Sequence, residues 1–274
     1  MMLEACILCG HTPLEVLDTH AARCSQCGLL HNLGAEETSY IEGGGQAVPD
    51  EAKTRWRLIN AQRRLNIVAP HFAGHDTLID IGCGSGEMLL AAKGRLPHVL
   101  GFDTNRPLIR HIRENLDLPV IEGYFDAAVI SPDLLARKKI FTLSHVLEHL
   151  EQPLELIRQI HAAMSPDDLL YIEVPLYTGH SFRQQGYHWN LWAAEHRALY
   201  SPQALDFIAS HCCFKMLSIG TRIFARGSYS TKTRLRLFFQ KPLRFLKCLV
   251  TKPRTLSIAD VMIGDYGFVV LRKL

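Results

Sequence analysis

Four cysteines near the amino terminus have the spacing of metal ligands. Cys6 and Cys9 form one Cys-x2-Cys pair, Cys24 and Cys27 form a second, and 14 residues separate the two pairs. Each pair can turn tightly enough to direct two thiolates at one tetrahedral ion, which is typical of a structural zinc site. A segment this short has too few apolar residues for a core, whereas zinc binding supplies folding free energy directly. We therefore predict a zinc ribbon over residues 1–31; the alternative is four cysteines that hold no metal.

A glycine-rich turn follows an apolar run in the middle of the chain. Leu78–Ile81 lead straight into the residues GCGSG at 82–86, and a helical pattern starts at Glu87. Glycines there permit a sharp turn and let a ligand lie against bare backbone. In a dinucleotide-binding loop the third glycine would fall at Glu87, whose carboxylate repels a pyrophosphate. The predicted ligand of this turn therefore carries no phosphate.

Asp103 ends the next predicted strand, His98–Asp103. A carboxylate at that place can accept hydrogen bonds from both hydroxyls of a ribose. A nucleoside ligand without phosphates is S-adenosylmethionine, which we predict as the cofactor.

The order of these residues resembles that of class I S-adenosylmethionine-dependent methyltransferases. Residues 78–86 look like motif I of that family, and Asp103 looks like its ribose-binding acid. The stretches LSHVLEHL at 143–150 and YIEVP at 171–175 resemble its fourth strand with the following helix and its fifth strand. The resemblance implies a doubly wound, Rossmann-like α/β fold with a seven-stranded sheet whose last strand is antiparallel, plus the small zinc ribbon.

The resemblance also implies where the cofactor lies, from its methionine end through the ribose and adenine to the sulfonium. The implied cofactor-binding residues are Asp80, Gly82, Cys83, Gly84, Asp103, Thr104, Tyr124, Phe125, Ser144 and His145.

Residues 176–200 are rich in aromatic and histidine side chains and directly follow the fifth predicted strand. In such sheets, the loops at this edge carry the side chains that contact the substrate. Methyl transfer is an in-line displacement that needs a lone pair on the acceptor atom. A histidine base can make this lone pair available by removing the proton of the acceptor. The pair Glu195-His196 is similar to the Glu-His pair of zinc-containing sugar C-methyltransferases, and His149 matches another functional histidine of that family. We predict His196 as the base, with Glu195 and His149 beside it. The structural alternative is that His196 caps a helix near Ser201.

Three further questions about the same residues stay open. His145–His149 fits the H-x-x-E-H pattern of a zinc peptidase helix, but His145 directly follows a predicted strand, which disfavours it. Ala193 stands where the sugar methyltransferases have a tyrosine, so carbon, nitrogen and oxygen acceptors are all open. A catalytically inactive scaffold with the methyltransferase fold is a third interpretation.

Alternating strand and helix patterns must position these residues. We expect strands at 77–81, 98–103, 140–144, 169–174, 215–221 and 267–271. We expect helices from Asp50 to Pro70, from Glu87, over 107–115 and over 146–164. The predicted organisation is a ribbon at 1–31, a glycine-containing linker at 32–49, and a methyltransferase domain at 50–274 with an insertion at 222–258.

The charge is unevenly distributed. Residues 222–254 contain ten Lys or Arg and no Asp or Glu, whereas the remaining 20 basic residues face 27 acidic ones. This imbalance indicates an anionic partner for the insertion. We predict a small, anionic acceptor such as a nucleotide sugar, a polysaccharide precursor or a secondary metabolite. RNA base methylation is the alternative, because ribosomal-RNA guanine methyltransferases also combine a zinc ribbon with this fold; contact with an anionic membrane surface stays open.

The compartment follows from what the sequence lacks. No stretch approaches the roughly 20 consecutive apolar residues of a membrane-spanning helix, and the amino terminus has no secretory signal pattern. We therefore expect a cytoplasmic protein with reduced cysteines.

Overall fold

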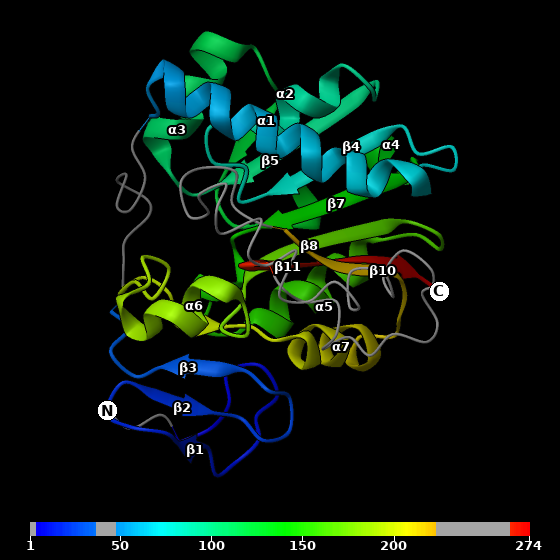
Figure 1. Ribbon diagram of the computed structural model, residues 1–274. Coiled ribbons are helices and arrows are strands. Elements are labelled where there is room, and N and C mark those ends of the chain that lie inside the picture. The colour runs from blue at the N-terminus through cyan, green and yellow to red at the C-terminus, as the bar shows by residue number, and fades with distance from the viewer. Residues whose placement is uncertain (1–3, 37–47, 223–263) are drawn as a thin grey trace, which may run out of the picture.

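The computed structural model describes residues 4–36, 48–222 and 264–274 (Figure 1). The predicted basic insertion at 222–258 lies outside the described residues except for Arg222, and so does most of the predicted linker at 32–49.

A seven-stranded mixed sheet forms the centre of the fold, in the order β10-β11-β8-β7-β4-β5-β6. β11 pairs antiparallel with both β8 and β10, while β4 to β8 run parallel. The strands are β4 (Thr77–Ile81), β5 (His98–Asp103), β6 (Val120–Glu122), β7 (Lys139–Ser144), β8 (Leu169–Pro175), β10 (Phe214–Arg222) and β11 (Tyr266–Lys273). The predicted fold class, including the antiparallel last strand, is confirmed.

Helices cover both faces of this sheet, which is why β4 and β8 are buried along their whole length. One layer contains α1 and α2 and the other contains α5 and α7 (Figure 1). Neighbouring residues of β4 point to opposite layers, since Leu78 packs with α1 and α2 and Ile79 with α5 and α7. The α-helices are α1 (Glu51–Val68), α2 (Glu87–Lys93), α3 (Arg106–His111), α4 (Pro132–Ala136), α5 (Pro153–Ala163), α6 (His180–Gln185) and α7 (Pro202–His211).

The helix expected over 146–164 starts later in the structure. A short 3-10 turn, Leu147–His149, follows β7, the chain is extended at Leu150, and α5 begins at Pro153. Proline has no backbone N–H to donate and favours the first turn of a helix, so Pro153 sets the start. The expectation for 107–115 is also refined, because α3 ends at His111 and a π-helical turn, Ile112–Leu116, follows.

The small sheet ties the amino-terminal segment to the main fold. It joins β1 (Glu15–Val16), β2 (Ala21–Arg23) and β3 (Leu30–Asn32) to β9 (Ala198–Leu199). β9 lies only two residues beyond His196, so the ribbon pairs directly with the segment that carries the predicted base.

Among the described residues, no helix combines the length and the apolar character needed to cross a membrane.

Candidate functional site

A cavity of about 1140 Å³ opens at the carboxyl ends of β4, β5 and β7. Its lining contains every residue predicted to bind the cofactor and all three predicted catalytic residues, Glu195, His196 and His149. The structure therefore brings both predicted groups into one space. After these predictions, we call the part formed by residues 80–87 and 103–105 the donor side, and the part formed by residues 146–149 and 191–197 the acceptor side.

The glycine turn needs glycine for two separate reasons. Gly82 has φ +72°, a left-handed conformation that other residues adopt only with strain. A Cβ atom at Gly82 would also lie 2.5 Å from Cγ2 of Val146. The turn can therefore pass close to the chain that follows β7, which connects the two sides of the cavity.

Asp103 is fixed beside this turn. Its two carboxylate oxygens accept hydrogen bonds from the backbone N–H groups of Gly84 (2.7 Å) and Asn105 (2.8 Å). Burial raises the pKa of Asp103, and these backbone donors counteract the rise. An oriented carboxylate on the cavity wall is the geometry that binding a ribose requires.

Asp80 lies deeper, at the end of β4. Its side chain is buried, and the Thr142 hydroxyl donates to its Oδ1 at 2.6 Å. Burial raises the pKa of Asp80 to about 7, although the Thr142 hydrogen bond opposes the rise. Asp80 therefore changes charge near neutral pH.

The predicted adenine residues differ from each other. Tyr124 is 77% exposed at the rim, whereas Phe125 is buried with its ring edge-on to Phe102 at 5.3 Å. Cys83 lines the cavity, but its Sγ packs beneath Gly101, where an added Cβ would lie 2.8 Å from the sulfur. The sulfur of Cys83 therefore packs against β5.

His145 has φ +60°, which is unusual for a residue with a side chain. Its Nδ1 lies 3.1 Å from Oε1 of Glu148, and its Nε2 lies 3.4 Å from Oε1 of Glu173. Burial lowers the pKa of His145, but the two carboxylates outweigh burial and raise it. The imidazole is fixed in place between the two carboxylates, and His145 precedes the short turn rather than lying on a long peptidase helix.

Sequence reasoning did not identify the ion cluster around Glu173. This carboxylate is buried in β8. Its Oε1 forms an ion pair with Arg64 of α1 and its Oε2 forms one with Arg222 of β10, each with an N–O distance of 2.7 Å. Burial raises the pKa of Glu173, but the two guanidinium groups bring it well below its usual range. Two features of the sequence could have indicated this cluster. Glu173 is a charged residue inside an otherwise apolar strand, and its partner Arg64 lies one turn after Asn60, which accepts a hydrogen bond from Arg222.

The two predicted catalytic histidines lie against each other. The rings of His149 and His196 have centroids 4.6 Å apart and an interplanar angle of 72°. Nδ1 of His149 donates to the Glu195 carbonyl at 3.0 Å, and Nδ1 of His196 donates to the Leu191 carbonyl at 2.7 Å. His196 does not cap α7, because the Ser201 hydroxyl accepts from the backbone of that helix.

The ribbon holds the backbone around His196. The Asn32 side-chain amide donates to the carbonyls of Ala193 (3.1 Å) and His196 (3.0 Å). The Asn32 backbone N–H donates to the Arg197 carbonyl at 2.9 Å. The position of His196 therefore depends on the amino-terminal segment.

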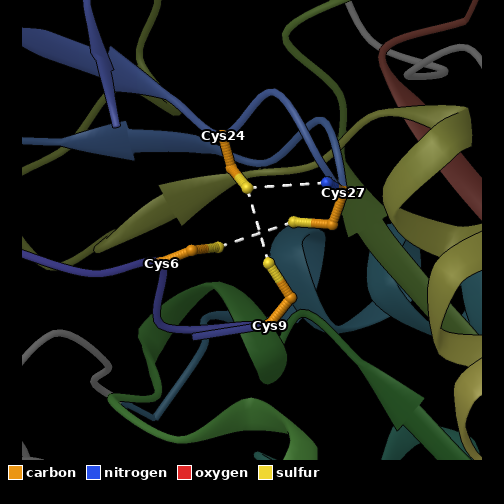
Figure 2. A group of neighbouring side chains, drawn as sticks. All are labelled: Cys6, Cys9, Cys24 and Cys27. Carbon is orange, nitrogen blue, oxygen red and sulfur yellow. Dashed lines mark hydrogen bonds between the residues drawn. The ribbon is translucent and has the colours of Figure 1, made fainter. Parts of the chain in front are cut away.

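The four ribbon sulfurs point at one another (Figure 2). All four lie within 4.8 Å of each other, and the closest pairs are Cys6 with Cys27 at 3.5 Å and Cys9 with Cys24 at 3.4 Å. Four thiolates around a tetrahedral zinc with bonds of about 2.3 Å stand roughly 3.8 Å apart. The cluster is therefore compatible with a zinc ribbon.

Comparison with known proteins agrees with this geometry. A methyltransferase domain family matches residues 53–218. No curated protein matches the sequence.

Solved structures with the same fold cover most of the chain. A SAM-dependent methyltransferase from Archaeoglobus fulgidus shares 20% identity at a TM-score of 0.53, covering 81% of this chain and 98% of its own. The plantazolicin methyltransferase BpumL, in complex with a pentazolic desmethylPZN analog and SAH, shares 17% identity at a TM-score of 0.51, covering 81% and 86%. A Thermotoga maritima methyltransferase, described as a possible histamine N-methyltransferase, shares 12% identity at 0.51, covering 81% and 91%.

The family match spans more than half of the chain, and the sheet order and the cavity agree with it. The chain belongs to the methyltransferase domain family and has the fold of the S-adenosylmethionine-dependent methyltransferases.

Proposed function

We propose that this protein transfers the methyl group of S-adenosylmethionine to a small, anionic acceptor. The observation that carries the proposal is that one cavity joins the glycine turn and Asp103 to His149 and His196. A methyl donor and its acceptor must share such a space, because the reaction is an in-line displacement at the methyl carbon.

On the donor side, we propose that Asp103 accepts the two ribose hydroxyls and that the turn at 82–84 faces the methionine end. Thr104, Tyr124 and Phe125 complete the nucleoside site, and Ser144 with His145 lies toward the sulfonium. Asp80 lies behind the turn, where its charge depends on pH. These assignments rest on the placement of the residues around the cavity.

On the acceptor side, we propose that acceptor activation takes place at His196. His196 Nδ1–H is engaged with a backbone carbonyl, so the neutral ring presents its lone pair at Nε2. Burial lowers the pKa of His196, which keeps the ring neutral at physiological pH. Glu195 and His149 line the cavity beside it and complete this side.

The anionic character of the acceptor is supported by the ten cations of residues 222–254. The first of them, Arg222, lines the cavity, as does Tyr266 just beyond the insertion. The backbone of Asp265 donates to the Arg222 carbonyl at 3.0 Å, so the described residues on either side of positions 223–263 meet at this wall.

For the ribbon, we propose a structural zinc ion bound by Cys6, Cys9, Cys24 and Cys27. Four thiolates satisfy a tetrahedral ion and leave no position for substrate. The role of this ion would be to stabilise the loops that lead into β3 and thereby the segment around His196.

The test is methyl transfer from S-adenosylmethionine with a labelled methyl group to matched acceptor pairs, such as a nucleotide sugar and the corresponding free sugar. The proposal predicts label in the anionic member of a pair and inhibition by free nucleoside diphosphate. Transfer to RNA alone, with binding that falls steeply as salt rises, would contradict the small acceptor. Failure of the zinc-loaded protein to bind S-adenosylmethionine would instead support an inactive scaffold.

A further inference from the structure

A second group of metal-ligating side chains lies on the acceptor side of the cavity. Glu148, His149 and His196 each place one ligand atom within 4.8 Å of the others. Glu148 and His149 come from the 3-10 turn after β7, and His196 comes from the segment held by the ribbon. The fold therefore brings two distant segments together at a point where three donors converge.

Each histidine of this group is oriented by a hydrogen bond from its Nδ1 atom to a backbone carbonyl. A backbone carbonyl can only accept a hydrogen bond, so the Nδ1 atoms of His149 and His196 must carry the protons in their bonds to Glu195 and Leu191. In the neutral rings the lone pair is then at Nε2. Metal-binding histidines are characteristically fixed in this way, with the other ring nitrogen donating to a backbone carbonyl or a carboxylate.

The carboxylate of Glu148 supplies the strongest sign of a missing cation. Its side chain is completely buried, and its Oε1 accepts a hydrogen bond from Nδ1 of His145 at 3.1 Å. Its Oε2 has no hydrogen-bond partner among the described residues. Buried polar atoms are nearly always satisfied, and an unsatisfied carboxylate oxygen is costly, so Oε2 needs a hydrogen-bond donor or a cation beside it, and the two neighbouring histidines make a shared cation the fitting partner.

We propose that Glu148, His149 and His196 bind one divalent transition metal ion, which in turn binds and activates a hydroxyl group of the methyl acceptor. Imidazole and carboxylate ligands suit ions such as zinc, manganese and cobalt, whereas the thiolates of the ribbon select zinc. Three protein ligands leave coordination positions for a substrate oxygen, as in catalytic metal sites.

The catalytic part of this inference rests on the proposed function and specifies it. A metal-bound hydroxyl loses its proton near neutral pH, as metal-bound water does. The proton passes to water in the cavity, and the oxygen then attacks the methyl carbon. The new O–CH₃ bond forms as the S–CH₃ bond breaks. The electron pair of the broken S–CH₃ bond stays on sulfur, which gives S-adenosylhomocysteine. His196 then acts as a metal ligand, and the metal ion takes over the activation of the acceptor from a histidine base.

Binding of Mn²⁺ to the zinc-loaded full-length protein tests the site without any acceptor. Mn²⁺ is a weak competitor for thiolates, so the ribbon keeps its zinc. The signal of free Mn²⁺ in electron paramagnetic resonance gives the affinity and the number of ions bound. We expect one Mn²⁺ per chain, at least tenfold weaker binding in His196→Ala and in His149→Ala, and unchanged binding in His188→Ala, whose histidine is exposed outside the cavity.

Two results would overturn the site. The first is that the folded wild-type protein binds neither Mn²⁺ nor, outside the ribbon, Co²⁺. The other is binding that persists unchanged in both histidine variants. Glu148→Gln is a third variant, but its buried position makes misfolding a risk, so the histidine variants decide. A calorimetric titration with S-adenosylmethionine on the same samples separates failure of the metal site from failure of the proposed methyl transfer.

Discussion

The donor side and the acceptor side of the cavity are built in different ways. Gly84 and Asp103, which are hydrogen-bonded on the donor side, are 19 residues apart in the sequence. On the acceptor side, His149 bonds to the Glu195 carbonyl across 46 residues, and Asn32 bonds to the Ala193 carbonyl across 161 residues. The donor side therefore forms within one strand, turn and helix unit and its neighbour, whereas the acceptor side depends on the ribbon and on the whole fold. Disturbing the ribbon should therefore impair the acceptor side and leave the donor side nearly unchanged.

Loss of a ribbon thiolate is expected to have the largest effect. Cys24→Ser removes one proposed zinc ligand, and structural zinc contributes on the order of 10 kcal/mol to folding of its segment. We expect the zinc content to fall by one ion per chain and the melting temperature to fall by many degrees. Mn²⁺ binding at His196 should weaken, while affinity for S-adenosylmethionine should stay within a few-fold of wild type.

Cys213→Ser is the matched control, because Cys213 is exposed and lies outside the ribbon. Equal loss of cofactor affinity and of Mn²⁺ binding in Cys24→Ser would show that the two sides are not independent.

Asp80 provides a pH-dependent test of the donor side. Because folding raises its pKa to about 7, the folded chain holds this proton more tightly than the unfolded chain does. The contribution of Asp80 to stability therefore declines as pH rises from about 4 to about 7. Asp80→Asn keeps the acceptor for Thr142 and removes the titration. Denaturant unfolding should show the variant gaining stability relative to wild type by on the order of 3 kcal/mol between pH 5 and pH 8; parallel curves would refute the raised pKa.

Gly82→Ala probes the contact between the two sides. The new Cβ adds strain at positive φ and a clash with Val146, together costing about 2 kcal/mol. Gly74→Ala is a close control, since Gly74 has φ +76° but a Cβ added there would meet no atom within 4 Å. The melting temperature should drop further at Gly82 than at Gly74. Equal drops would mean that the close approach to Val146 does not matter.

Asn32→Ala should have the smallest effect and the most selective one. It removes two hydrogen bonds to backbone carbonyls, worth about 1 kcal/mol each. We expect weaker Mn²⁺ binding by several-fold with unchanged affinity for S-adenosylmethionine, measured beside Asn190→Ala at an exposed position. A change in cofactor affinity alone would contradict the proposed role of the ribbon.

The difference between local contacts on the donor side and long-range contacts on the acceptor side also explains which features the sequence could predict. The strands β4 and β5, the glycine turn and Asp103 follow from local periodicity and from turn chemistry, so their placement was predictable. The late start of α5 has a local cause, because Pro153 favours the first turn of a helix, whereas the positive φ of His145 leaves no periodic signal in the sequence.

Long-range pairing accounts for the rest. The pairing of β3 with β9 and the cluster of Glu173 with Arg64 and Arg222 join residues far apart in the chain. The first depends on how the ribbon meets the main fold, and the second depends on how α1 and β10 meet β8, so local periodicity alone does not identify the partners. The buried Lys139 ammonium pairs with the Asp168 carboxylate at 2.9 Å, and this pair also joins residues that are 29 positions apart in the chain.

The central claim is that one cavity holds the methyl donor against Asp103 and the acceptor against His196. Calorimetric titration of S-adenosylmethionine into wild type, Asp103→Ala and His196→Ala tests it most directly. Losing hydrogen bonds to a charged group weakens binding by roughly 10- to 100-fold. We predict saturable binding in wild type, a loss of that size in Asp103→Ala, and unchanged affinity in His196→Ala. Equal affinity in wild type and Asp103→Ala, or no binding by the folded wild-type protein, would contradict the account.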